Sequence, residues 1–139
     1  MRLAVAGTAL VAAAIFAGFV AAGNAPGPGW TEVAADDGIF AAYADRSSIR
    51  REGTVAFMRG MYDFRRGDFT PQGFPFHSTL VDREYDCSAS RVRLLAYEDH
   101  AQRFGEGPIV GSARSLRRWE AIAEGSLDAA FFRVACGAI

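Results

Sequence analysis

The stretch that decides the fold is HSTLVDREYDCS, residues 77–88. Uncharged and acidic residues alternate along it, as they do in a strand whose two faces meet different surroundings. One face of the extended chain carries Thr79, Val81, Tyr85 and Cys87. The other face carries Asp82, Glu84 and Asp86. The pattern predicts a half-buried β-strand in which Arg83 is the one charged residue on the inner face.

Segments on both sides repeat this alternation of strand and turn. Turn signals such as Asp36-Asp37-Gly38 and Glu52-Gly53 separate short runs rich in aromatic and β-branched residues, which is typical of an antiparallel sheet. We expect strands at residues 30–35, 39–44, 54–65, 77–88 and 91–97, with shorter ones near 109–110 and 118–122. The polar segment 45–51 is expected to connect two of these strands.

The last element changes to a helical period. Ser126 is a good N-cap, Asp128 complements the helix dipole, and Gly137 suits the C-cap, so we expect a helix over Leu127–Cys136. Its apolar residues fall on two sides, with Phe132 and Cys136 roughly opposite Leu127, Phe131 and Val134. A surface helix shows one apolar stripe. Either the last turn unwinds, or the helix is covered both by the sheet and by a second subunit, which would make the protein a homodimer.

Cys87 and Cys136 are the only two cysteines of the chain. A disulfide between them would close a loop of about 50 residues and stabilise the fold by about 4 kcal/mol on the chain-entropy estimate. A redox-active pair would need the C-x-x-C spacing that lowers a thiol pKa, and the chain lacks that spacing. The predicted fold class is therefore α+β: an antiparallel β-sheet of roughly six strands with one C-terminal α-helix, stapled by one disulfide.

The first residues predict export. Arg2 precedes an uncharged run from Leu3 to Ala22, and the small residues at its end resemble a signal-peptide cleavage site. We expect a signal peptide at 1–22, a flexible Pro/Gly linker at 23–29 and one domain at 30–139. Since a bilayer core takes about 20 residues, an uncleaved membrane anchor is the alternative. Either way the domain faces the periplasm, the cell surface or the medium.

Composition and motifs exclude several classes of function. The 15 basic and 16 acidic residues give a formal charge of −1, which offers no field for nucleic acid. The only histidines, His77 and His100, have no second ligand at metal-binding spacing. The chain has no G-x-S-x-G elbow and no Walker motif. We therefore expect a non-enzymatic protein without cofactor, metal or catalytic residues.

The segment 66–76 is the candidate partner-contact loop. Its glycines and prolines predict a long irregular connection, and such loops often carry function. The candidate contact residues are Arg66, Gly67, Asp68, Phe69, Phe74 and Phe76. The first three form the tripeptide that many integrin ligands display, although this Arg-rich and Gly-rich composition yields it readily by chance. The phenylalanines could contact a partner protein, or they could fold back as a lid on the core.

Several separate segments together resemble the surface-adhesin protein E family of bacterial exported proteins. The longest is Tyr43–Arg51, which resembles the family's Tyr-x-Asp-Pro-Ser-Ser-Ile segment, with Arg46 where the family commonly has Pro. Trp30, Glu84–Cys87, Trp119, Gly125-Ser126 and Val134–Cys136 complete the match, which spans nearly the whole mature chain. The resemblance implies a six-stranded antiparallel sheet with a C-terminal helix.

The resemblance also implies a class of function. The founding member of the family is a host-protein-binding adhesin that recognises matrix components such as vitronectin and laminin. Its binding segment is not among the matched motifs, so the resemblance assigns no binding residue here. We expect a non-enzymatic, adhesin-like module whose partner is an extracellular or envelope protein. The alternative is a periplasmic small-ligand-binding or envelope-stress protein whose concave sheet holds an apolar molecule.

Overall fold

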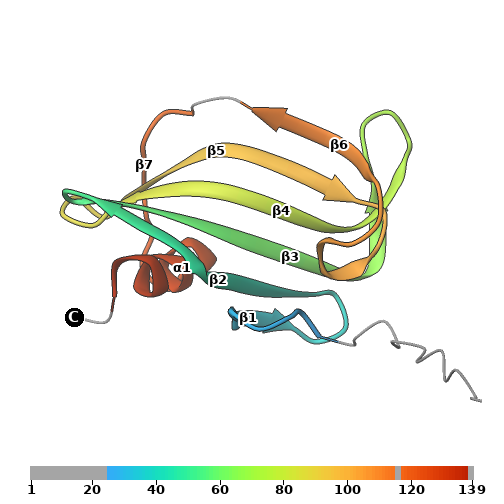
Figure 1. Cartoon of the computed structure of the whole chain (residues 1–139), viewed down its shortest axis with the longest axis horizontal. Coiled ribbons are helices and arrows are strands. Elements are labelled where there is room, and N and C mark those ends of the chain that lie inside the picture. The colour runs from blue at the N-terminus through green and yellow to red at the C-terminus, as the bar shows by residue number, and fades with distance from the viewer. Residues whose placement is uncertain (1–24, 115–116, 138–139) are drawn as a thin grey trace, which may run out of the picture.

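The structure, a computed structural model, describes residues 25–114 and 117–137. Its strands are β1 (Trp30–Asp36), β2 (Phe40–Glu52), β3 (Val55–Phe69), β4 (Pro75–Asp86), β5 (Arg91–His100), β6 (Ile109–Arg114) and β7 (Glu120–Ala121). Strands β1 to β6 pair in chain order, and every pair is antiparallel (Figure 1). Strand β7 pairs with the first residues of β5, Arg91 and Val92, whereas β6 pairs with the second half of β5. The helix α1 (Leu127–Cys136) and a 3-10 turn, η1 (Arg103–Gly105), complete the fold. The predicted fold class is confirmed.

The second strand is longer than its sequence indicates. We expected residues 45–51 to connect two strands, but β2 takes in the whole segment. The pairing of β2 with β3 shifts between Asp45 and Arg50, so that residues 46–49 form a β-bulge. A bulge adds unpaired residues to one strand and redirects their side chains. The expectation was wrong because these polar residues extend the strand as a bulge and do not end it.

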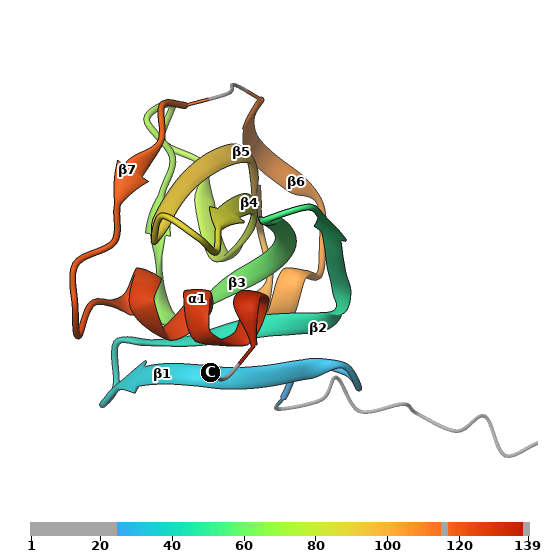
Figure 2. The same cartoon turned by 90° about the vertical axis from the view of Figure 1, so that its left-hand side faces the viewer.

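The helix α1 packs on one face of the sheet. Figure 2 shows the sheet curling around it, and α1 contacts all of β1 to β4. Phe131 is completely buried and lies against Gly60, where a Cβ atom would come within 3.0 Å of the Phe131 ring. Tyr62 meets the same ring edge-on at 6.0 Å between centroids. The glycine in the middle of β3 therefore allows the helix to approach the sheet closely.

The caps of α1 follow the sequence prediction. The Ser126 hydroxyl accepts a hydrogen bond from the Ala129 amide at 3.1 Å, and Gly137 ends the helix with a φ of +82°. The second apolar side of the helix is also accounted for, because Phe132 packs edge-on against Tyr85 at 6.4 Å. One curled sheet thus contacts both sides of α1, and the last turn does not unwind.

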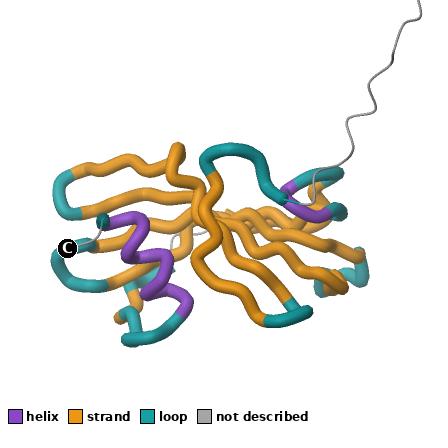
Figure 3. The backbone as a smooth tube through the Cα atoms, turned by 90° about the horizontal axis from the view of Figure 1, so that it is seen from below, coloured by secondary structure: helices purple, strands orange, loops and turns teal. Residues whose placement is uncertain are grey.

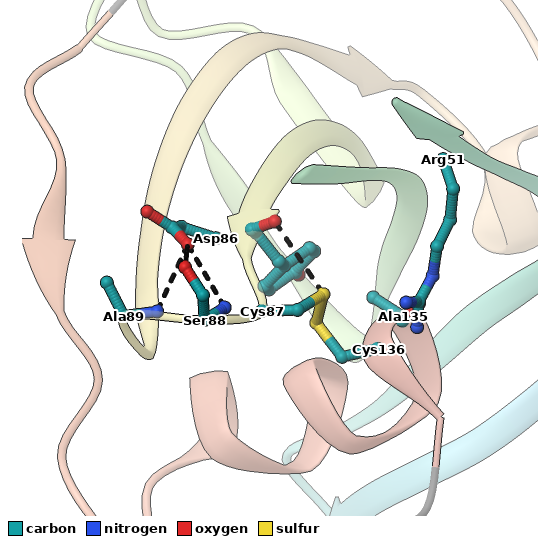
Figure 4. Close-up of a disulfide and its surroundings, with 8 residues drawn as sticks. Arg51, Asp86, Cys87, Ser88, Ala89, Ala135 and Cys136 are labelled. Carbon is teal, nitrogen blue, oxygen red and sulfur yellow. Dashed lines mark hydrogen bonds between the residues drawn. A yellow bond between two sulfur atoms is a disulfide. The ribbon is translucent and has the colours of Figure 1, made fainter. Parts of the chain in front are cut away.

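The disulfide joins α1 to the end of β4. Cys87 and Cys136 are bonded, with their Cα atoms 5.6 Å apart. Figure 4 shows the bridge beside Asp86, whose Oδ1 accepts hydrogen bonds from the Ser88 amide, the Ser88 hydroxyl and the Ala89 amide. The Arg91 guanidinium binds Asp86 Oδ2 at 2.7 Å. The predicted disulfide is confirmed, and a hydrogen-bonded turn supports it.

The turn η1 lies at the other end of the sheet. Figure 3 shows α1 and η1 at opposite ends. On β3, even-numbered residues such as Gly60 face α1, so Asp63 faces away from it. Asp63 is completely buried and binds the Arg103 guanidinium at 2.6 Å and the Phe104 amide at 3.0 Å. An ion pair therefore fixes η1, where Phe104 adopts a φ of +57°.

No helix in the described ranges is both long and apolar enough to span a membrane. The predicted signal peptide at 1–22, or the anchor that is its alternative, lies outside the described residues. The linker at 23–29 is described only from residue 25. These three assignments stay predictions.

Candidate functional site

Most of the predicted loop 66–76 is a β-hairpin. Strand β3 continues to Phe69 and β4 begins at Pro75, so a short turn joins them. Thr70 organises this turn, because its amide donates to the Phe74 carbonyl at 2.8 Å and its hydroxyl accepts from the Phe74 amide at 3.1 Å. The expected long loop was wrong in extent: prolines and glycines here shape the turn and a bulge, while backbone pairing continues on both sides.

The three phenylalanines of this hairpin separate into two groups. Phe69 is 69% exposed and Phe74 is 55% exposed, so both present their rings to solvent. Phe76 instead meets the Phe64 ring edge-on, with 5.8 Å between centroids. The lid interpretation therefore fits Phe76 alone. Phe69 and Phe74 are free to contact a partner.

The Arg66-Gly67-Asp68 tripeptide lies in a bulge of β3 and not in a flexible loop. The pairing of β3 with β4 shifts between Asp63 and Asp68, so the segment between them protrudes. Gly67 has a φ of +71°, and a Cβ atom there would lie 2.7 Å from the Phe76 carbonyl oxygen. The bulge therefore requires glycine for structural reasons. Arg66 and Asp68 are both exposed beside it.

Two further exposed apolar side chains lie at this end of the sheet. Ile39, in the turn between β1 and β2, is 59% exposed, and its carbonyl accepts from the Arg65 amide of β3 at 3.0 Å. Ile109 is 52% exposed and pairs with His100 at the end of β5. We use the name apolar end for the surface formed by four exposed side chains at this end of the sheet: Ile39, Phe69, Phe74 and Ile109. Sequence reasoning missed both isoleucines, because only the register of the strands places these separate turns at the same end of the sheet.

A second candidate site is a groove on the face of the sheet that points away from α1. It has a volume of about 730 Å³ and crosses five strands, from β2 to β6. We call it the outer groove. Its charged residues are three arginines, Arg50, Arg59 and Arg114, and three acids, Asp45, Asp82 and Glu84. Ser48 and the apolar residues Phe57, Leu95 and Ala96 complete the lining.

Two β-bulges direct side chains into the outer groove. In the β2 bulge, the Ser48 hydroxyl donates to the Asp45 carbonyl at 2.7 Å and accepts from the Arg59 amide at 2.8 Å. Ile49 packs on the α1 side, whereas Ser48 and Arg50 line the groove. In β5, the pairing skips Leu95, which also lines the groove. Bulges often re-aim side chains next to binding sites.

Three of the six charged side chains in the outer groove, Arg59, Asp82 and Glu84, are held in ion pairs. Arg59 holds Asp82 through two hydrogen bonds, of 2.7 Å and 3.0 Å, and the hydrogen bond to Asp82 raises the pKa of Arg59. Glu84 pairs with Arg93 at 2.6 Å. The Arg50 guanidinium lies over the Phe57 ring, 4.2 Å from its centroid. These contacts orient Arg50, Arg59, Asp82 and Glu84 in the groove.

Sequence reasoning missed this groove. The residues come from five strands, and no local motif joins them. The one available signal was the polar run Tyr43–Arg51, which carries the family resemblance and supplies Asp45, Ser48 and Arg50.

The two histidines serve the fold. The Nδ1 atom of His77 lies 2.9 Å from the Ala101 carbonyl, and that of His100 lies 3.3 Å from the Gly107 carbonyl. Within residues 25–114 and 117–137, no three His, Cys, Asp or Glu side chains gather in a way that could hold a metal ion.

Comparison with known proteins places the chain in a family. The model of the family "Surface-adhesin protein E" matches residues 30–137. The fold is similar to a crystal structure of protein E from non-typeable Haemophilus influenzae, with a TM-score of 0.64 and 11% identity over 84% of this chain and 81% of that one. A second crystal form of Haemophilus influenzae protein E gives a TM-score of 0.66 and 10% identity, covering 84% and 94%. None of the curated proteins matches significantly. Because the family model covers the domain from β1 to the end of α1, the chain belongs to the surface-adhesin protein E family.

Proposed function

We propose that this protein is a non-enzymatic, exported module that binds an extracellular or envelope protein through its apolar end. One observation carries the proposal: the large apolar side chains that are more than half exposed among the described residues, Ile39, Phe69, Phe74 and Ile109, all lie at one end of the sheet. Large apolar side chains exposed at one end of a sheet are candidates for a protein contact site.

The surroundings of the apolar end also suit a partner contact. A cavity of about 380 Å³ lies between the β1–β2 turn and the β3 bulge, lined in part by Ile39, Arg66 and Asp68. An apolar side chain in a pocket with charged groups at its rim is common in protein interfaces. Membership of an adhesin family supports the same class of function.

The structure does not favour the alternative, a carrier of an apolar small molecule. The outer groove has six charged side chains in its lining, and an apolar ligand there would cover them without replacing their contacts with water. We therefore keep protein binding as the proposed function.

A photocrosslinking experiment tests this proposal. Benzoylphenylalanine replaces Phe69 in one variant and Glu52, at the opposite end of the sheet, in a matched control. Each variant is illuminated in two separate experiments. In the first it is in the cells that export it, and in the second the purified protein is bound to immobilised vitronectin or laminin. We expect a discrete adduct from position 69 and none from position 52. Equal labelling from both positions, or no adduct from position 69, would contradict the proposed contact surface.

Surface protease treatment of intact cells tests the location. An adhesin is cleaved from outside, whereas a periplasmic protein is cleaved only after the outer membrane has been opened.

A further inference from the structure

The outer groove has a balanced set of charges. Its lining has three arginines and three acids; Asp82 is held by Arg59 within the lining, and Glu84 is held by Arg93 beside it. A site with balanced charge attracts neither anions nor cations strongly. The groove therefore suits a ligand without net charge.

The paired groups nevertheless keep hydrogen-bonding capacity. Arg59 uses its Nε and Nη2 atoms for Asp82, and a guanidinium has five N–H donors in all. Each carboxylate oxygen has two lone pairs, so Asp82 and Glu84 can accept further hydrogen bonds. Asp82 is 18% exposed and Glu84 is 25% exposed at the side chain. Donors and acceptors thus stand side by side in fixed positions along the groove.

Apolar surface lies between these polar groups. Phe57 on β3, together with Leu95 and Ala96 on β5, supplies the apolar part of the lining. Leu95 is the unpaired residue of the β5 bulge, so the bulge itself contributes apolar surface at this point. A ligand that fills the groove must have both apolar faces and polar edges.

We propose that the outer groove binds a neutral oligosaccharide segment. A sugar hydroxyl donates and accepts at one atom, which matches adjacent arginine and carboxylate groups, and the C–H faces of a sugar ring match Phe57, Leu95 and Ala96. The volume of about 730 Å³ lies within the usual range for small-ligand sites. The sugar could come from the bacterial envelope or from glycoproteins outside the cell, and the chemistry is the same.

Calorimetric titration of the exported protein tests the proposal. The two probes are an amidated muropeptide disaccharide that carries no net charge, for the envelope, and a neutral, asialo N-glycan, for external glycoproteins. We expect at least one probe to bind, with an affinity that changes by less than about twofold between about 0.05 M and 0.5 M NaCl, because a neutral ligand is not screened by salt. Failure of both probes, or a steep loss of affinity with salt, would overturn the proposal.

Two groove variants locate the binding. Ala96→Phe fills the groove, and Asp82→Asn removes a charged acceptor, so each should weaken binding by about tenfold or more. Glu120→Gln, on an exposed strand outside the groove, is the matched control and should bind like the parent protein. Thermal melting checks that each variant is folded. Unchanged affinity in a folded Ala96→Phe variant would place the sugar elsewhere and overturn the assignment.

The apolar end provides an independent control. The variant with Phe69→Ser and Phe74→Ser should lose the protein contact proposed above and retain sugar binding. Loss of sugar binding in this variant would contradict the placement of the sugar in the groove, whatever happens to the protein contact.

Discussion

The two ends of this domain are held together by different interactions. We call the end that carries α1 the helix end, and the end that carries η1 and the β3–β4 turn the hairpin end. At the helix end, Phe131 of α1 is buried against the sheet and the disulfide ties Cys136 to Cys87. At the hairpin end, a buried polar contact between Asp63 and Arg103 holds η1, while large apolar side chains face the solvent. The helix end therefore buries its large apolar side chains, whereas the hairpin end buries a carboxylate and exposes several large apolar side chains.

This difference assigns separate roles to the two ends. Apolar burial and a covalent bond stabilise the helix end. The hairpin end obtains its order from an ion pair and a hydrogen-bonded turn, and Phe69 and Phe74 stay outside the core. A domain that must present apolar groups to a partner can do so when another region provides most of its stability. The predictions below test this division, from the largest effect to the smallest.

Replacing Phe131 with alanine should have the largest effect on stability. The ring is completely buried between the helix and Gly60, so the change leaves a cavity and should lower the free energy of unfolding by about 3–5 kcal/mol. Urea denaturation measures this loss. Phe69→Ala, at the apolar end, is the control and should change stability by less than about 0.5 kcal/mol. Similar losses from the two changes would remove the distinction between the ends.

Replacing Cys136 with serine should lower stability by about 2–5 kcal/mol, the usual loss when a small secreted domain is deprived of its disulfide. The bond spans 49 positions in the chain, so its removal frees a large loop in the unfolded state. Denaturation of the oxidised parent and of the variant measures the difference, and mass analysis of the parent should detect no free thiol. Equal stability would mean that α1 holds to the sheet by packing alone.

Replacing Asp63 with asparagine should cost about 2 kcal/mol. Breaking a buried ion pair usually costs more, but the Arg103 side chain is 42% exposed and regains water when its partner is neutral. Hydrogen exchange should show faster exchange around η1 and unchanged protection of α1. Faster exchange spread evenly over both ends would show that the two ends do not respond separately.

Acid should loosen the turn beside the disulfide. Hydrogen bonds from Arg91 and Ser88 lower the pKa of Asp86 from 3.8 to about 2. A carboxylate with a lowered pKa stabilises the folded state above its unfolded pKa, and this contribution disappears as the pH falls from about 4 to about 2. NMR titration of the Ser88 and Ala89 amides follows this change. The Asp86→Asn variant should lack it, and a parent protein whose amides titrate near pH 4 would contradict the shift.

The sequence predicted the helix end better than the hairpin end, and the reason is physical. The alternation along residues 77–88 and the caps of α1 are local signals; α1 has the predicted bounds, and β4, at Pro75–Asp86, starts and ends two residues earlier than predicted. Arg83 was expected on the inner face, and its guanidinium lies there, above the Tyr62 and Phe131 rings at 5.6 Å. At this end, the residues that the sequence pattern assigns to the inner face also lie there in the structure. A local sequence pattern is therefore enough to predict these elements.

At the hairpin end and in the outer groove, the decisive contacts are distant in the sequence. The Asp63–Arg103 pair joins residues that are 40 positions apart, and no pattern around either residue marks the other. The bulges in β2 and β3 contain Ser47-Ser48 and Gly67, which local reasoning assigns to turns. These residues lie within long strands, because pairing with the neighbouring strands continues on both sides of each bulge.

The order of the strands has a consequence for how the chain folds. Each of β1 to β6 pairs with its neighbour in the chain, so the sheet can grow one hairpin at a time through contacts between nearby segments. The contact of Phe131 with Gly60 joins segments that are far apart, and it requires a sheet that is already assembled. We therefore expect α1 to dock last, so that oxidation of the cysteines seals a sheet already formed and does not guide its assembly.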